Sequence, residues 1–115
     1  MIRLTGQTIA IDQGSLLVFD DYETNGEMWT GTGKRERRIE IRFAASFRGP
    51  PAVQVSLAMW DVHGGTNQRG DLGAEVVTER GFQLVFRTWD DTRVARIRAN
   101  WIAIGEVPDE DDWDV

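Results

Sequence analysis

The sequence predicts an all-β protein, a sandwich or barrel built from about five to seven short strands. Apolar and polar residues alternate with a period of two in five stretches of the chain, which is typical of strands with one buried face. Turn-forming combinations of Gly, Pro, Asn and Asp separate these stretches. No segment carries apolar residues at positions i, i+3, i+4 and i+7 over three turns, so no helix is expected.

The alternating stretches follow one another in order, and two short apolar runs at residues 8–11 and 15–19 add N-terminal strand candidates. The five stretches are residues 38–47, 52–60, 69–78, 81–89 and 93–104. Alternation assigns to the buried face Ile39, Ile41, Phe43, Val53, Val55, Leu57, Met59, Leu72, Ala74, Val76, Phe82, Leu84, Phe86, Ile97, Ala99, Trp101 and Ala103. It assigns to the other face Glu40, Arg42, Gln54, Ser56, Asp71, Glu75, Gln83, Val85, Arg87, Val94, Arg96, Arg98 and Asn100.

The charge of the chain is concentrated at its C-terminal end. The 115 residues carry 13 basic and 19 acidic side chains, a formal net charge of −6. Six of the acids and none of the bases lie in residues 106–115, so residues 1–105 are formally neutral. We therefore expect a β-sandwich domain over residues 1–105 and a polar, acidic tail over residues 106–115.

The composition argues against several classes of function. Without a basic excess, nucleic acid is not an expected partner. No apolar run approaches the ~18 residues that a membrane helix needs, so insertion into a membrane is not expected. The chain has no Cys, hence no disulfide and no thiolate metal site. The N-terminus lacks an apolar signal core, which leaves the location open between the cytoplasm and release by a non-classical route.

Little in the sequence suggests catalysis, a metal or a cofactor. The single histidine, His63, lies in a turn sequence, and no serine has the Gly-x-Ser-x-Gly setting of a hydrolase. The acid pairs Asp20-Asp21 and Asp90-Asp91 leave a glycosidase as one alternative, because that chemistry uses two carboxylates. Adjacent acids in turns are more often simply solvated. We therefore expect a protein that is not an enzyme.

Trp89 is the residue most suggestive of binding. By alternation it lies opposite the apolar face of its strand, and it ends that strand directly before Asp90-Asp91. An exposed Trp beside acids and an Arg can recognise a polyol, because the ring packs on C–H groups while the charged groups bond the hydroxyls. The alternative is that Trp89 packs at the rim of the sandwich.

Residues 38–105 resemble the H-type lectin family. The matching features, in chain order, are Phe43, Phe47, Pro50-Pro51, the strand at 53–57, Asp61-Val62, Asn67, Arg69, Gly81-Phe82, Thr88-Trp89, Thr92, Val94 and residues 101–104. The resemblance implies a six-stranded antiparallel β-sandwich that forms a homotrimer, or a hexamer of two stacked trimers. It also implies glycan binding between subunits, with galactose or N-acetylgalactosamine as the ligand and no catalysis.

The same resemblance implies the site residues. Arg69 matches the sugar-binding arginine, Trp89 the stacking aromatic, and Asp90 the polar residue after it; Asn67 belongs to the same matching segment. The position of the family's key aspartate falls near Thr32, where this chain has no acid. Asp90 or Asp91 can supply the missing acceptor, and Trp29 a second stacking wall.

The departure at Thr32 leaves a second interpretation open, a structural or adhesion trimer that has lost its sugar site. Charges on the outward strand faces are expected to support assembly in either case, by pairing within or between subunits. These charges are Glu40, Arg42, Asp71, Glu75, Arg96 and Arg98.

Overall fold

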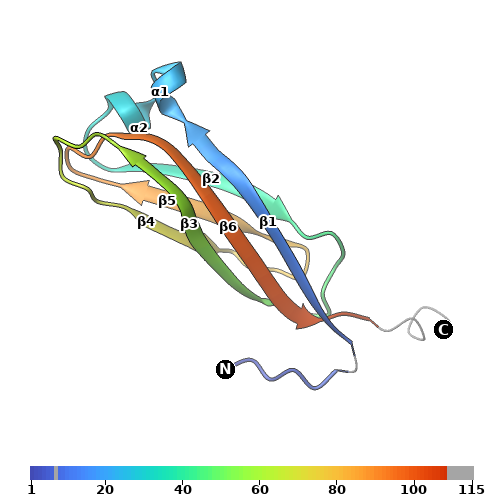
Figure 1. Cartoon of the computed structure of the whole chain (residues 1–115). Helices are drawn as coiled ribbons and strands as arrows, with labels where there is room; N and C mark the ends of the chain where they lie inside the picture. Colours follow the sequence, from blue (N-terminus) through green and yellow to red (C-terminus); the bar gives the residue numbers. More distant parts are fainter. Residues whose placement is uncertain (7, 109–115) are drawn as a thin grey trace.

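A computed structural model describes residues 1–6 and 8–108 of the chain. Six strands and two single-turn helices follow one another, and Figure 1 shows them as an elongated sandwich with both helices at one end. The elements are β1 (Ile9–Asp20), α1 (Asp21–Thr24), α2 (Glu27–Thr30), β2 (Arg35–Arg42), β3 (Ala52–Val62), β4 (Asp71–Glu75), β5 (Gly81–Thr88) and β6 (Val94–Glu106).

The strands form two three-stranded antiparallel sheets, with the orders β1-β6-β3 and β2-β5-β4. The predicted all-β sandwich is confirmed, and all five long alternating stretches contain a strand. The two N-terminal candidates are parts of one continuous strand, β1, which pairs with β6 along its length. Both chain ends of the described part lie at the end of the sandwich away from the helices (Figure 1).

Aromatic side chains fill the core between the sheets at the end away from the helices. The ring of Phe43 packs against Phe47, Phe82 and Trp101, with centroid distances of 5.0, 5.9 and 5.9 Å. Trp101 is therefore a core residue, as predicted. Gly14 allows this packing, because a Cβ there would lie 2.5 Å from Nε1 of Trp101. Burial of each large ring contributes roughly 2–3 kcal/mol to folding.

A β-bulge in β3 changes which side chains face the core. The register of β3 against β6 shifts between Leu57 and Met59, so the strict alternation ends there. Leu57, predicted to be buried, is 48% exposed. After the bulge it is Trp60 and Val62, not the predicted Met59, that pack against the core.

Two other inward or outward assignments are wrong for related reasons. Alternation places Val94 on the outer face, but it is fully buried, because a second register shift falls between Asp61 and Val62 opposite the start of β6. Alternation places Val76 in the core, but it is 63% exposed, because β4 ends at Glu75 and Val76 adopts a φ of 50°.

The expectation of no helix is also wrong, because the chain forms two single helical turns. Each turn is too short to carry a periodic signal. Asp20 caps α1, its Oδ1 accepting a hydrogen bond from the Glu23 N–H at 3.1 Å, and Asn25 ends the turn in the left-handed conformation. The second turn, α2, buries Met28 completely. No helix of the described residues is long and apolar enough to cross a membrane.

The predicted boundary at residue 105 falls inside the last strand. β6 continues to Glu106, and the N–H of Val107 donates to the carbonyl of Thr8 at 3.1 Å. Glu106 also accepts hydrogen bonds from the backbone N–H groups of Thr5 and Gly6. The rest of the expected tail, residues 109–115, lies outside the described residues.

Candidate functional site

All the predicted site residues except Trp29 lie just after the end of β5 or on the segments that lead into β2 and β4. Thr88 is buried at the end of β5, and the next side chain, Trp89, is 38% exposed. Asp90 follows with a φ of 63°, a left-handed conformation that turns the chain sharply. Its carbonyl accepts a hydrogen bond from the Gly33 N–H at 2.9 Å, which holds the loop containing Thr32 against this turn.

Arg69 and Asp90 form an ion pair at this end of the sandwich. Nε of Arg69 lies 3.4 Å from Oδ2 of Asp90, and both side chains are about half exposed. The pair places a guanidinium and a carboxylate side by side on the surface. The carboxylate belongs to Asp90, the residue that directly follows Trp89. This combination can bond neighbouring hydroxyl groups of a polyol, the guanidinium donating and the carboxylate accepting.

Two buried threonines hold the Arg69 segment in place. The Thr92 hydroxyl accepts from the Arg69 N–H at 3.1 Å and donates to the Asn67 carbonyl at 2.8 Å. The Thr88 hydroxyl donates to the Arg69 carbonyl at 2.6 Å. Both threonines are almost completely buried, so these bonds are shielded from water. The backbone that carries Arg69 is therefore fixed against the Trp89-Asp90 turn.

Asn67 and Asp91 interact with each other. Oδ1 of Asp91 accepts from the Asn67 backbone N–H at 3.2 Å and from its side-chain amide at 3.0 Å. These two predicted site residues thus tie the loop before β4 to the turn after β5. These contacts indicate that Asn67 and Asp91 support the loops of the site. The acid that lies beside Arg69 is Asp90.

Arg35 organises the same end of the molecule, and no pattern in the sequence pointed to it. Its side chain is buried and donates to the backbone carbonyls of Gly33, Glu27, Met28 and Asp90 at 3.0–3.3 Å. Burial lowers the pKa of Arg35 from its usual value, and the carboxylate of Glu27 opposes that effect. One guanidinium therefore joins α2, the Thr32 loop and the turn at Asp90.

A cavity of about 520 Å³ lies beside Trp89. Its lining residues are Lys34, Arg35, Glu36, Asp71, Arg87, Thr88 and Trp89. The aromatic wall and the mixed charges suit a ligand with C–H faces and hydroxyl groups. Arg69 and Asp90 do not line this cavity, but Trp89, which precedes Asp90, and Asp71, two residues after Arg69, do.

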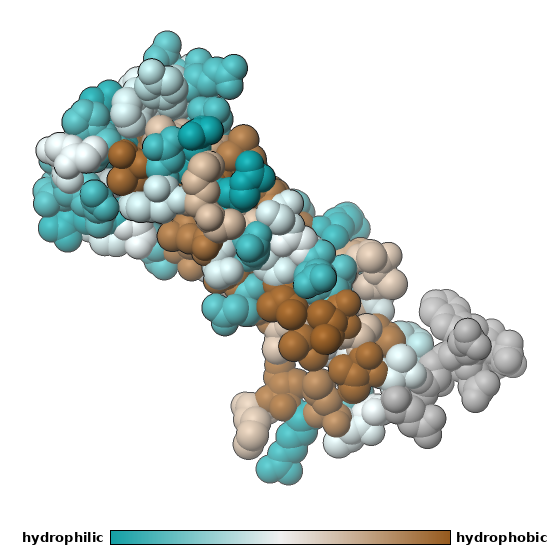
Figure 2. Space-filling view, in the orientation of Figure 1, coloured by the Kyte–Doolittle hydropathy of each residue, from teal (hydrophilic) through white to brown (hydrophobic). Residues whose placement is uncertain are grey.

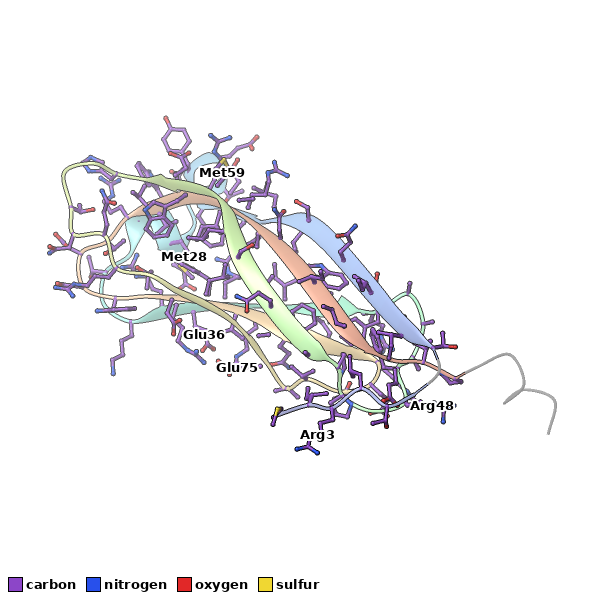
Figure 3. All side chains as sticks on the ribbon, turned by 60° about the horizontal axis from the view of Figure 1, so that its bottom comes forward. Arg3, Met28, Glu36, Arg48, Met59 and Glu75 are labelled. Carbon is purple, nitrogen blue, oxygen red and sulfur yellow. The ribbon has the colours of Figure 1, made fainter. Side chains whose placement is uncertain are left out.

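Four charged side chains next to this cavity form a closed ring on the outer face of the β2-β5-β4 sheet. Glu36 pairs with Arg38 and Arg87 at 2.9 and 2.7 Å, and Glu75 pairs with the same two arginines at 3.1 and 2.7 Å. Figure 3 shows Glu36 and Glu75 near one another on the side of this sheet away from β1-β6-β3. Val85 also lies on this outer face, between Arg38 of β2 and Gly73 of β4, yet it is only 1% exposed.

The ring shifts the pKa of its members in the expected directions. A hydrogen bond from Arg38 is the main reason why the pKa of Glu36 is lowered, and one from Arg87 does the same for the pKa of Glu75. The pKa of each arginine is raised, chiefly by its bond to Glu36 or Glu75. The charges therefore neutralise one another within one chain.

Trp29 does not join Trp89. Its ring packs edge to face on Tyr22 at 5.2 Å, and the guanidinium of Arg93 lies 4.3 Å from its centroid. It lines a different cavity, at the end of the β1-β6-β3 sheet, and is absent from the lining of the cavity beside Trp89. This placement does not support the expectation that Trp29 forms a second stacking wall beside Trp89.

The other groups considered for chemistry have structural partners. Asp20 caps α1, while buried Asp21 pairs with Arg37 at 2.9 Å and accepts from the Met28 N–H at 3.0 Å. Nδ1 of His63 accepts from the Gly65 N–H. Within residues 1–6 and 8–108, no group of three or more His, Asp and Glu side chains could hold a metal ion.

Comparison with known proteins settles the family. A family model described as "H-type lectin domain" matches residues 38–104, more than half of the chain. The chain belongs to the H-type lectin domain family. The resemblance carried by residues 38–105 is thereby confirmed.

Relatives of this H-type lectin domain include proteins of very different length. A protein of Fuscovulum blasticum described as "ATP synthase subunits region ORF 7" is 50% identical over 115 residues, 100% of this chain and 99% of that protein. A discoidin-1 polypeptide of Dictyostelium discoideum is 36% identical over 75 residues, 64% of this chain. Those residues make up 30% of the discoidin-1 polypeptide, so this H-type lectin domain corresponds to only part of that relative.

The fold has a solved counterpart. Recombinant discoidin II of Dictyostelium discoideum superposes with a TM-score of 0.75 and 22% sequence identity, covering 91% of this chain and 40% of that chain. At this identity the similarity shows a shared fold. It agrees with the sandwich of two three-stranded sheets in this H-type lectin domain.

Proposed function

We propose that this protein is a lectin that binds a saccharide at the surface formed by Arg69, Trp89 and Asp90, without catalysis. The main support is the ion pair of Arg69 with Asp90, the residue that directly follows the exposed Trp89. Membership of the H-type lectin domain family supports carbohydrate binding in general. The buried threonines and Arg35 support it further, because they hold the backbone of Arg69 and Asp90 in place before any ligand arrives.

Asp90 is the proposed acceptor that replaces the acid missing near Thr32. Its half-exposed carboxylate lies beside the guanidinium of Arg69, so one group can accept from a sugar hydroxyl while the other donates to its neighbour. Thr32 lies on the loop held against Asp90 and offers only a hydroxyl. Galactose or N-acetylgalactosamine is proposed as the ligand because the chain belongs to the H-type lectin domain family, with Asp90 as the specificity-determining residue.

Assembly into a homotrimer, with a neighbour completing each site, is the second part of the proposal. The assembly itself is supported by an apolar area on the outer face of the β1-β6-β3 sheet, away from the helices (Figure 2). Ile11, Ile104 and Ala52 stand in register across its three strands, and Ile11 is 64% exposed. The neighbouring Ile9 is also exposed. An apolar area of this kind on a small domain favours a protein interface.

The outward charges are less suited to assembly than expected. Glu75 belongs to the closed ring with Arg38, and Arg96 pairs with Asp61 of the same chain at 2.9 Å. The apolar face is therefore the proposed interface. A hexamer of two stacked trimers is the alternative assembly.

Such an assembly would bind glycans through several sites at once, and this multivalency would raise its avidity. A single shallow sugar site binds weakly, since it buries little area and its ligand is well hydrated. Three or six sites on one body raise avidity by ~10²–10⁴ where the glycans are dense. The proposed role is recognition of a glycan-coated surface.

Two contacts favour the second candidate, a structural trimer that has lost its sugar site. The Nε of Arg69 is already engaged by Asp90, and Asn67 and Asp91 are bonded to each other. In that case the loop end of the sandwich would be stable without a ligand. This candidate predicts no glycan binding at all.

A glycan array separates the two candidates. The lectin predicts binding to galactose-type glycans that Arg69→Ala or Trp89→Ala abolishes while the oligomer survives. The matched control is Arg80→Ala, because Arg80 is exposed and lies near the opposite end of β5. Absence of binding to every glycan would favour the structural trimer.

A further inference from the structure

A second cavity of about 520 Å³ lies at the helical end of the β1-β6-β3 sheet. The end of β1, both helical turns, the end of β3 and the start of β6 contribute to it (Figure 1). Its lining residues are Asp20, Tyr22, Glu23, Trp29, Asp61, Val62, Ala95 and Arg96. None of them lines the cavity beside Trp89.

Two aromatic rings form an angled wall of this cavity. Tyr22 is 62% exposed, and its ring meets Trp29 at 75° with the centroids 5.2 Å apart. Arg93 covers one face of Trp29: its guanidinium lies 4.3 Å from the ring centroid, and its Nε donates to the Trp29 carbonyl at 2.9 Å. The exposed ring of Tyr22 is an open apolar surface on which the C–H face of a small ligand can pack.

The charged groups of this cavity leave an excess of acid. Asp20, Glu23 and Asp61 line it, against Arg96 in the lining and Arg93 over the Trp29 ring. Asp61 forms an ion pair with Arg96, whose Nε lies 2.9 Å from Oδ2 of Asp61. Among the described residues no side chain pairs with the carboxylate of Glu23, and Asp20 uses one oxygen to cap α1.

We propose that this cavity is a second ligand site and that it binds an amino sugar, a saccharide with a free ammonium group. The aromatic wall of Tyr22 and Trp29 takes the C–H face of the sugar ring. The unpaired Glu23 carboxylate, with Asp20 at the cap, attracts the ammonium, which is also drawn to the exposed ring of Tyr22. The Arg96–Asp61 pair offers a donor and an acceptor to the hydroxyl groups. The site goes beyond the proposed galactose-type site and shares no residue with it.

Titration of the ¹⁵N-labelled full chain with glucosamine, followed by the indole N–H signal of Trp29, tests this site. We expect saturable shifts of that signal, with binding at least tenfold weaker for glucose and for N-acetylglucosamine, which carry no charge. Methylammonium alone should also bind at least tenfold more weakly, because it lacks the sugar ring. Equal binding of glucosamine and glucose, or of glucosamine and methylammonium, would overturn the assignment, as would shifts that do not saturate.

Variants distinguish this cavity from other acidic surface and from the first site. Glu23→Gln is expected to weaken glucosamine binding severalfold, and Tyr22→Ala to abolish it; both residues are exposed, so the fold should survive. The matched control, Glu79→Gln, changes an exposed carboxylate elsewhere on the chain and should leave binding unchanged. Trp89→Ala should also leave glucosamine binding unchanged, even if the site at Arg69, Trp89 and Asp90 binds no sugar. Equal losses in Glu23→Gln and Glu79→Gln, or loss in Trp89→Ala, would contradict the proposal.

Discussion

Buried Arg35 donates a hydrogen bond from Nη2 to the backbone carbonyl of Asp90, 3.3 Å away, and so joins the start of β2 to the turn that carries the proposed acceptor. The same guanidinium bonds the carbonyls of Glu27 and Met28 at α2. The conformation of the candidate site therefore depends on a guanidinium that is itself buried.

Replacement of Arg35 by Ala should lower the free energy of unfolding by about 2–4 kcal/mol, because buried carbonyls lose their donors. It should also weaken sugar binding, since the Asp90 carbonyl keeps only the hydrogen bond from Gly33. Arg35→Lys should recover only part of the stability, because a single ammonium cannot reach all four carbonyls. Urea unfolding measures the effect. Arg42→Ala, at an exposed position of the same strand, is the control and should change little.

Thr92→Val should lower stability by about 1–3 kcal/mol, although the side chain keeps its shape. The buried hydroxyl both accepts from the Arg69 N–H and donates to the Asn67 carbonyl, and valine leaves both unpaired. Hydrogen exchange of the Arg69 amide should therefore become faster in the variant. Thr32→Val, on the exposed loop, should show neither effect; an unchanged Arg69 amide in Thr92→Val would refute the role given to the hydroxyl.

The closed charge ring should make stability depend on pH. The pKa values of Glu36 and Glu75 are lowered in the folded state below the ordinary 4.5, so the ring stabilises the fold above that pH. This contribution is lost as the pH falls through the lowered values and the carboxylates take up protons.

A double variant, Glu36→Gln with Glu75→Gln, should accordingly be less stable than the parent chain at pH 7, and the difference should shrink towards pH 3. High salt should reduce the difference as well, because the ring is exposed. Urea unfolding at both pH values gives the comparison. Glu40→Gln on the same strand serves as the control, and a difference that grew on acidification would contradict the stabilising role of the ring.

The apolar face of the β1-β6-β3 sheet should control assembly. Ile11→Asp places a charge within this face at a well-exposed position and should convert a trimer, three times the 13.0 kDa chain mass, into monomers with an unchanged circular dichroism spectrum. Light scattering at micromolar concentration measures the mass. Val76→Asp, an exposed apolar residue on a turn after β4, should not alter it. A parent chain that is already monomeric would remove the basis for intersubunit sites.

The strands could be predicted because each has one buried face, and burial imposes the alternation directly. The bulge after Leu57 could not, since its position depends on the pairing of β3 with β6 and leaves no local mark. The same holds for Val94, whose burial follows from a register shift in the opposite strand. The two helical turns have four residues each, so no apolar pattern can repeat within them along a helical face.

The candidate site was predictable where side chains determine it and unpredictable where backbone groups do. Arg69 and Asp90 could be placed together from the family resemblance, and the structure pairs them. Arg35 could not be found, because its acceptors are carbonyls that only the tertiary fold brings around it. Trp29 lines a different cavity from the expected one, because sequence alone does not show on which side of α2 a ring will pack.

The central claim is that Arg69, Trp89 and Asp90 together bind a saccharide. A titration of the ¹⁵N-labelled chain with N-acetylgalactosamine, observed at the Trp89 indole and the Arg69 Nε–H, tests it most directly. We expect saturable shifts of both signals, with Asp90→Asn weakening binding at least tenfold. No shift at either signal, even with a large excess of every sugar tried, would contradict the claim.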